Sequence, residues 1–130
     1  MKDTIGFIGC GNMAQAMIGG VVSSGLFTGA QIIAYDPSEA QRRKVAEKFG
    51  IRTAESNIGV ASEADYLVLA VKPFVYADVL REIAGHTKKD VIVIVIAVGV
   101  EFSDVKDILG KDTKVIRTQP STPAFVGESD

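Results

Sequence analysis

The stretch that decides the fold is Gly9-Cys10-Gly11-Asn12-Met13-Ala14, which matches the pattern G-x-G-x-x-A. It follows the apolar run Thr4-Ile5-Gly6-Phe7-Ile8, which predicts a buried strand, and it precedes a segment with helical periodicity. A strand, a glycine loop and a helix in this order are the context in which the pattern binds a dinucleotide. The stretch therefore predicts the first strand-helix unit of a dinucleotide-binding domain.

Each small residue of the loop has a distinct expected role. Gly9 permits the tight turn, Gly11 lets a pyrophosphate approach the backbone, and Ala14 lets the helix pack closely on the strand. The free amides and positive dipole at the helix N-terminus stabilise phosphate charge. Cys10 occupies a variable position of the pattern, and we interpret it as an inert loop residue because a thiolate would repel the pyrophosphate.

The helix after the loop is predicted from apolar residues on one face, with Gly25 at its end. These residues are Ala14, Met17, Ile18 and Val21. We interpret the stripe of Met13, Met17 and Val21 as core.

The rest of the chain alternates strands with helices. Further strands are predicted at 31–35, 51–54, 66–71, 91–97 and 114–118, and further helices at 38–50, 58–61, 75–83 and 103–109. Apolar strands joined by helices imply a parallel sheet covered on both faces, since parallel neighbours need crossover connections. The predicted fold class is α/β, a doubly wound parallel sheet of the Rossmann type with about six strands.

Composition excludes several function classes. The 130 residues carry a net charge of -2, which offers no polycationic surface for nucleic acid or anionic lipid. The longest apolar run, 91–100, is about half of a membrane-spanning helix. The single cysteine allows no internal disulfide, and the only histidine, His86, is expected in a surface connection, so no metal site is proposed. We expect a cytoplasmic protein.

Asp36 lies at the end of the second predicted strand, about 20 residues beyond the glycine loop, where a carboxylate can bind both hydroxyls of the adenosine ribose. That role favours NADH. Arg42, Arg43 or Lys44 on the next helix could instead offset the 2′-phosphate of NADPH. Asp36 is alternatively an ordinary residue of the Asp36-Pro37 turn, with the basic trio solvated, so the choice between NADH and NADPH stays open.

Several segments together resemble pyrroline-5-carboxylate reductases. The run from Gly6 to Gly20, with Asn12-Met13 after the second glycine, is similar to the opening of that family. The resemblance continues in Glu55-Ser56-Asn57, in Ala70-Val71-Lys72-Pro73 and in 122–128, Thr-Pro-Ala-Phe-Val-Gly-Glu. It implies reduction of the cyclic imine of pyrroline-5-carboxylate to proline, with hydride from NADH or NADPH, as the last step of proline biosynthesis.

The resemblance also implies site residues. It places 8–13, the residues Ile8 to Met13, on the pyrophosphate and Asn57 beside the adenosine ribose. The residues expected to border the nicotinamide are Ala70, Val71, Lys72, Pro73, Ala97 and Gly99. Lys72 could face a phosphate or the nicotinamide, or only solvent, and Thr122 could face the substrate or only cap a turn between prolines. No residue is identified as the proton donor.

The sequence departs from the family pattern near the expected substrate site, at Gln119, Ser121 and Val98. The family continues into a helical domain that dimerises and supplies most of the substrate pocket. We therefore expect residues 1–120 to form the cofactor domain and 121–130 to begin a linker to that domain, which is absent here. The isolated chain should be poorly active. The alternatives are a reductase resembling β-hydroxyacid dehydrogenases and a non-catalytic dinucleotide-binding module.

Overall fold

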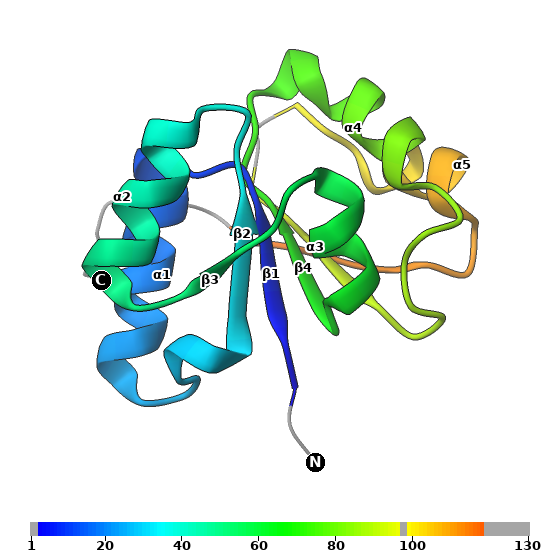
Figure 1. Cartoon of the computed structure of the whole chain (residues 1–130). Helices are drawn as coiled ribbons and strands as arrows, with labels where there is room; N and C mark the ends of the chain where they lie inside the picture. The colour runs from blue at the N-terminus through cyan, green and yellow to red at the C-terminus, as the bar shows by residue number, and fades with distance from the viewer. Residues whose placement is uncertain (1–2, 97–98, 119–130) are drawn as a thin grey trace.

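The computed structural model describes residues 3–96 and 99–118, which form one parallel sheet covered by helices (Figure 1). The strands are β1 (Ile5–Ile8), β2 (Ile32–Tyr35), β3 (Arg52–Thr53), β4 (Tyr66–Leu69), β5 (Ile92–Val95) and β6 (Lys114–Arg117). The α-helices are α1 (Asn12–Ser24), α2 (Glu39–Phe49), α3 (Asn57–Glu63), α4 (Tyr76–Ile83) and α5 (Phe102–Leu109). Short 3-10 helices occupy η1 (Gly29–Gln31) and η2 (Pro73–Val75).

The strand order is β3-β2-β1-β4-β5-β6, and every neighbouring pair is parallel. From the central strand β1 the chain first winds outward to β3, and it then returns to β4 and winds outward to β6. The winding direction changes between β1 and β4, which is the switch point where sheets of this kind bind ligands. The predicted doubly wound fold is confirmed.

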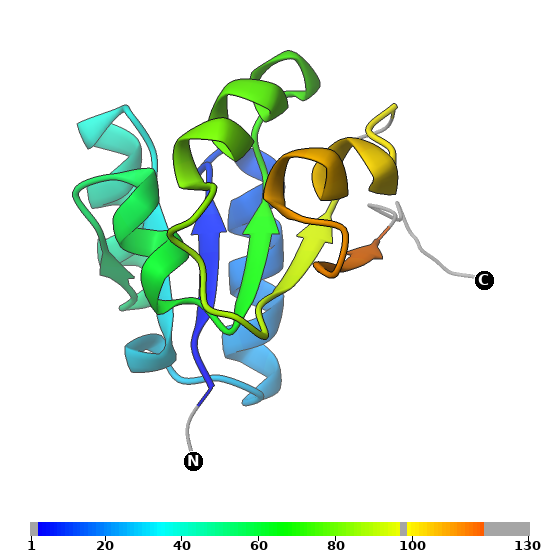
Figure 2. The same cartoon turned by 90° about the vertical axis from the view of Figure 1, so that its right-hand side faces the viewer.

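Two apolar layers sandwich the sheet, because successive strand residues point to opposite faces. In Figure 2, α1 lies behind the sheet, whereas α3, α4 and α5 lie in front of it. The layer against α1 and α2 includes Phe7, Ala14, Ile18, Val45 and Val68. The layer against α3, α4 and α5 includes Ile8, Val60, Leu67, Leu80 and Val105.

The predicted helix ends agree with the structure where the sequence carries capping residues. Gly25 and Gly50 end α1 and α2 in the left-handed conformation that glycine favours. The hydroxyl oxygen of Ser38 accepts the amide of Gln41 at 3.2 Å and so caps α2.

Met13 is an exception to the predicted core stripe. Its exposed fraction is 42%, whereas Met17 and Val21 pack partly buried against the sheet. Met13 lies in the first turn of α1, beyond the end of β1, so no strand covers it. The interpretation of Met13 as core is therefore wrong, although its exposure leaves it accessible to a ligand at the helix N-terminus.

Candidate functional site

Four loops meet at one edge of the sheet because the strands that they follow are all parallel. The loop after β1 is the glycine loop, Asp36 follows β2, residues 70–72 follow β4, and Gly99 and Val100 follow β5. This carboxyl edge contains the switch point between β1 and β4.

Gly9 is required by the fold itself. Its amide donates to the carbonyl oxygen of Tyr35 at 2.8 Å, and the neighbouring carbonyl of Ile8 accepts the amide of Ala70 at 2.8 Å. Its φ is +103°, and a Cβ atom there would lie 2.7 Å from the carbonyl oxygen of Ala70. The ends of β1, β2 and β4 therefore pack around a residue that must lack a side chain.

Gly11 is a glycine for a different reason. Its φ of -77° is open to any residue, and a Cβ atom there would meet nothing within 4 Å among the described residues. Serine, aspartate or asparagine would cap α1 better than the glycine at this position. Neither backbone geometry nor internal packing explains the missing side chain, whereas close approach of a ligand to the backbone does.

The N-terminus of α1 is well suited to hold an anion. The first intrahelical bond is the one from the Gln15 amide to the Gly11 carbonyl, at 2.9 Å, so the amides of Asn12, Met13 and Ala14 precede it. Within the described chain no side chain caps this end, and its first turn holds no acidic residue. These amides, the helix dipole and the open space at Gly11 together fit a diphosphate.

The side chain of Asp36 is hydrogen-bonded to the glycine loop. One carboxylate oxygen, Oδ2, accepts the amide of Cys10 at 2.9 Å, and the other, Oδ1, accepts the amide of Ser38 at 2.9 Å. The second bond is the turn interaction expected of an ordinary Asp-Pro turn. Each carboxylate oxygen has a further lone pair, so the side chain can still accept ribose hydroxyls. The structure thus shows a local role for Asp36 that is compatible with the expected ribose contact.

Of Arg42, Arg43 and Lys44 on α2, Arg42 is the one that bonds to the end of β2 within the described chain. The guanidinium of Arg42 donates to the carbonyl of Asp36 at 2.7 Å and lies over the ring of Tyr35, 5.4 Å from its centroid. Arg43 instead pairs with Glu39 at 3.0 Å on the exposed face of the helix, and Lys44 is exposed. Arg42 is therefore the basic side chain best placed to face a phosphate near Asp36.

Cys10 is fully buried, and its surroundings disfavour the thiolate. Burial, followed by the charge of Asp36, raises the pKa of its thiol to about 12. The carbonyl of Cys10 accepts the side-chain amide of Gln15 at 2.9 Å. The structure supports the interpretation of Cys10 as an unreactive loop residue.

Gln15 is a site residue that the sequence analysis missed. It is the one polar residue in the buried core of the described chain, 9% exposed, and its bond to Cys10 fixes a peptide group of the glycine loop. The sequence could have indicated Gln15 because this polar residue follows Ala14 directly, on the face of α1 that packs against the sheet.

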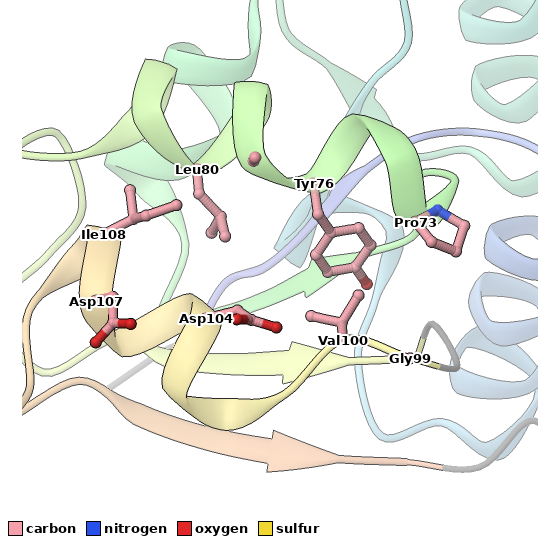
Figure 3. A pocket seen from close by; sticks show the side chains of 9 residues that line it. Pro73, Tyr76, Leu80, Gly99, Val100, Asp104, Asp107 and Ile108 are labelled. Carbon is pink, nitrogen blue, oxygen red and sulfur yellow. The ribbon is translucent and has the colours of Figure 1, made fainter.

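The other expected cofactor residues that the structure describes lie along the same edge. Asn57 is the first residue of α3, and its side-chain amide donates to Glu82 on α4 at 2.9 Å. Lys72 is exposed and precedes η2. Pro73 and Gly99 line the same cavity, so the loops after β4 and β5 lie near each other (Figure 3).

That cavity, of about 410 Å³, lies between α4 and α5, on the opposite face of the sheet from α1. Its walls are largely apolar and include Tyr76, Leu80, Val100 and Ile108, with Asp104 and Asp107 on the α5 side (Figure 3). It is therefore separate from the glycine loop, and only its rim belongs to the loops that we expect at the nicotinamide.

Some expected residues lie outside the described ones, namely Ala97, Val98, Gln119, Ser121, Thr122 and the segment 121–130. His86 lies in an exposed turn after α4. Residues 3–96 and 99–118 contain no group of three or more histidine, cysteine or acidic side chains placed to hold a metal ion. None of the helices described has both the length and the apolarity needed to cross a bilayer.

Comparison with known proteins gives concordant matches. Residues 4–99 match the family model described as NADP oxidoreductase coenzyme F420-dependent. The chain is 44% identical over 126 residues to the pyrroline-5-carboxylate reductase of Escherichia coli strain K12, covering 97% of this chain and 47% of that relative. It thus spans about half the length of the curated relatives that it matches.

Solved structures agree with these matches. A pyrroline-5-carboxylate reductase from Coxiella burnetii superposes with a TM-score of 0.85 at 32% identity, over 90% of this chain and 43% of that one. A pyrroline carboxylate reductase from Plasmodium falciparum with NADP bound superposes with a TM-score of 0.77 at 23% identity, over 88% of this chain and 41% of that one. The second likeness shows the fold alone.

Proposed function

Because this chain belongs to the NADP oxidoreductase, coenzyme F420-dependent family and is similar to pyrroline-5-carboxylate reductases along nearly all of its length, we propose that it is the cofactor-binding part of such a reductase. The proposed reaction is reduction of pyrroline-5-carboxylate to proline, the last step of proline biosynthesis. One observation of the structure gives the cofactor-binding role its strongest support. Among the described residues no side chain caps the N-terminus of α1, and the space beside Gly11 at that end is open.

We assign the diphosphate to 8–14, with the amides of Asn12, Met13 and Ala14 as the principal donors. Gly11 leaves the approach open. The backbone of Cys10 is held on both sides, because its amide donates to Asp36 and its carbonyl accepts the side-chain amide of Gln15. The loop is thereby fixed before a ligand arrives, so little ordering is needed on binding.

The adenosine ribose belongs, in this proposal, between Asp36 and Asn57. Both residues follow carboxyl ends of strands on the β2 side of the switch point. The charge of Asp36 favours the free hydroxyls of NADH, whereas Arg42 offers a cation to the 2′-phosphate of NADPH. Either dinucleotide therefore remains a candidate, with Asp36 favouring NADH.

The nicotinamide end belongs on the β4 and β5 side, against Ala70, Val71, Lys72, Pro73, Ala97 and Gly99. The bound dinucleotide supplies a hydride, and the residues of this chain hold it in one orientation toward the imine. Reduction of an imine also needs a proton, because the iminium form accepts hydride more readily. The candidate polar groups are Lys72, on this side, and Thr122, which lies outside the described residues, and we assign the proton to neither.

We propose that residues 1–120 form the cofactor domain and that 121–130 lead toward the part of the longer relatives that this chain does not match. That part would complete the substrate pocket and join copies into a homo-oligomer. The sequence has a single cysteine, Cys10, and so forms no internal disulfide, which fits a reducing compartment, and we propose the cytoplasm.

Calorimetric titration with NADH and NADPH, followed by an assay with pyrroline-5-carboxylate, tests this function. We expect at least one dinucleotide to bind and the chain alone to turn over the imine slowly. Absence of binding by both dinucleotides in a folded sample would overturn the cofactor assignment. Robust steady-state turnover by this chain would contradict the proposal that the second part is needed.

A further inference from the structure

Tyr76 links the two ends of the loop that follows β4. It is the first residue of α4, its exposed fraction is 4%, and its hydroxyl donates to the carbonyl of Leu69 at 2.5 Å. Leu69 is the last residue of β4, so this buried bond joins the end of the strand to the start of the helix.

The loop between these two residues is bonded at both ends, while its middle faces outward. At the β4 end, Ala70 donates its amide to Ile8 at 2.8 Å. At the other end, the amide of Val75 donates to the carbonyl of Lys72 at 2.9 Å in the turn before α4. Lys72 and Pro73 are exposed between these bonds. The position of the exposed part therefore depends on how firmly each end is held.

The ring of Tyr76 is part of the apolar core between α4 and the sheet. It extends from α4 toward Val100 and forms one wall of the cavity of about 410 Å³ (Figure 3). Because core packing leaves the ring little freedom, its hydroxyl is held beside the end of β4. The bond to Leu69 therefore gives the end of β4 a fixed partner on α4.

We propose that Tyr76 is a positioning residue, whose bond to Leu69 holds residues 70–73 in the arrangement that receives the nicotinamide end of the dinucleotide. This inference rests on the proposed function. Tyr76 acts on the loop through the backbone of β4, and we assign it no contact with the reacting atoms.

The test compares NADH with ADP-ribose, which lacks the nicotinamide, on wild type, Tyr76→Phe and Tyr66→Phe. Tyr76→Phe keeps the ring and removes the donor. Tyr66 lies at the opposite end of β4, where its ring contacts Phe27, so Tyr66→Phe is the matched control. We expect Tyr76→Phe to lower the affinity for NADH about fivefold, which is the effect of one buried hydrogen bond. The affinity for ADP-ribose should stay unchanged. Tyr66→Phe should change neither.

If Tyr76 has only a structural role, Tyr76→Phe should lower the affinities for NADH and ADP-ribose by the same factor. That result, or unchanged NADH affinity in Tyr76→Phe, overturns the inference while the proposed function stands. If folded wild type binds neither NADH nor NADPH, both the inference and the proposed function are overturned. Amide hydrogen exchange of 70–72 in wild type gives a second measurement that needs no variant. It should slow with NADH and not with ADP-ribose, and equal slowing by the two ligands contradicts the inference.

Discussion

Replacing Gly11 by alanine separates ligand binding from folding more sharply than any other change in the glycine loop. The added methyl group meets nothing within 4 Å, and the φ of -77° suits alanine. The expected cost is that of a poorer helix N-cap, about 1 kcal/mol or less. For a chain of 130 residues this lowers Tm by roughly 3–5 °C.

Binding should respond far more strongly. The methyl group lies where the diphosphate is proposed to reach the amides of α1, and each charge-assisted hydrogen bond is worth about 1.5–3 kcal/mol. Loss of two such bonds corresponds to an affinity at least about 100-fold lower, at roughly 1.4 kcal/mol for each tenfold change. Calorimetry with NADH and NADPH measures the affinity, and thermal melting of the same samples measures stability.

Gly9→Ala is the matched control because the fold itself needs that glycine. The methyl group would lie 2.7 Å from the carbonyl oxygen of Ala70, at a φ of +103°. We expect a loss of at least about 2–3 kcal/mol, which lowers Tm by roughly 10 °C. Dinucleotide affinity at the wild-type level in Gly11→Ala, or equal destabilisation by the two substitutions, would refute the reasoning.

Three other predictions concern stability and reactivity. Asp65→Ala should lower the free energy of unfolding by about 1–2 kcal/mol near pH 7, because the carboxylate accepts the amide of Thr4 at 2.8 Å and pairs with Lys88 at 3.1 Å. These contacts lower the pKa of Asp65 below 3.8 in the folded chain, so the loss is full above 3.8 and should shrink as the pH falls below 3.8 and through the lowered pKa. Urea melts showing a constant difference down to about pH 3 would contradict this. Cys10, with a pKa of about 12, should resist iodoacetamide at about pH 8 until urea unfolds the chain, and rapid labelling of the native protein would count against its burial. Gln15→Leu should cost about 1–3 kcal/mol and weaken dinucleotide binding, because it leaves the buried carbonyl of Cys10 without that donor; unchanged melting and affinity would show that the bond is dispensable.

The order of elements could be predicted because local signals carried it. The strands in the middle of the sheet are apolar on both faces, so their sequences differ plainly from those of the helices. Gly25 and Gly50 marked helix ends through their left-handed backbone. β3 carries a weaker signal and pairs over only two residues, Arg52 and Thr53.

The contacts that shape the site were not predictable in the same way. Gln15, Tyr76 and Arg42 each bond to a backbone carbonyl. The Gln15 bond joins α1 to the glycine loop, and the Tyr76 bond joins α4 to β4. Both form only because the folded backbone brings these segments together. The sequence predicts a ribose contact for Asp36, which stays a prediction. The bond from the Cys10 amide to the Asp36 carboxylate was not predictable, because it depends on how the ends of β1 and β2 meet. Met13 was misjudged because helical periodicity does not show where the sheet ends.

The most direct test of the proposed diphosphate site at the glycine loop is an NMR titration of the folded chain with NADH and NADPH, following the backbone amides of Gly9 to Ala14. We predict that at least one dinucleotide shifts these amides, with the largest changes at Asn12 and Met13 and little change at the opposite edge of the sheet, around Lys88. If saturating amounts of both leave the six amides unmoved, the glycine loop does not bind a diphosphate and the proposed function is wrong.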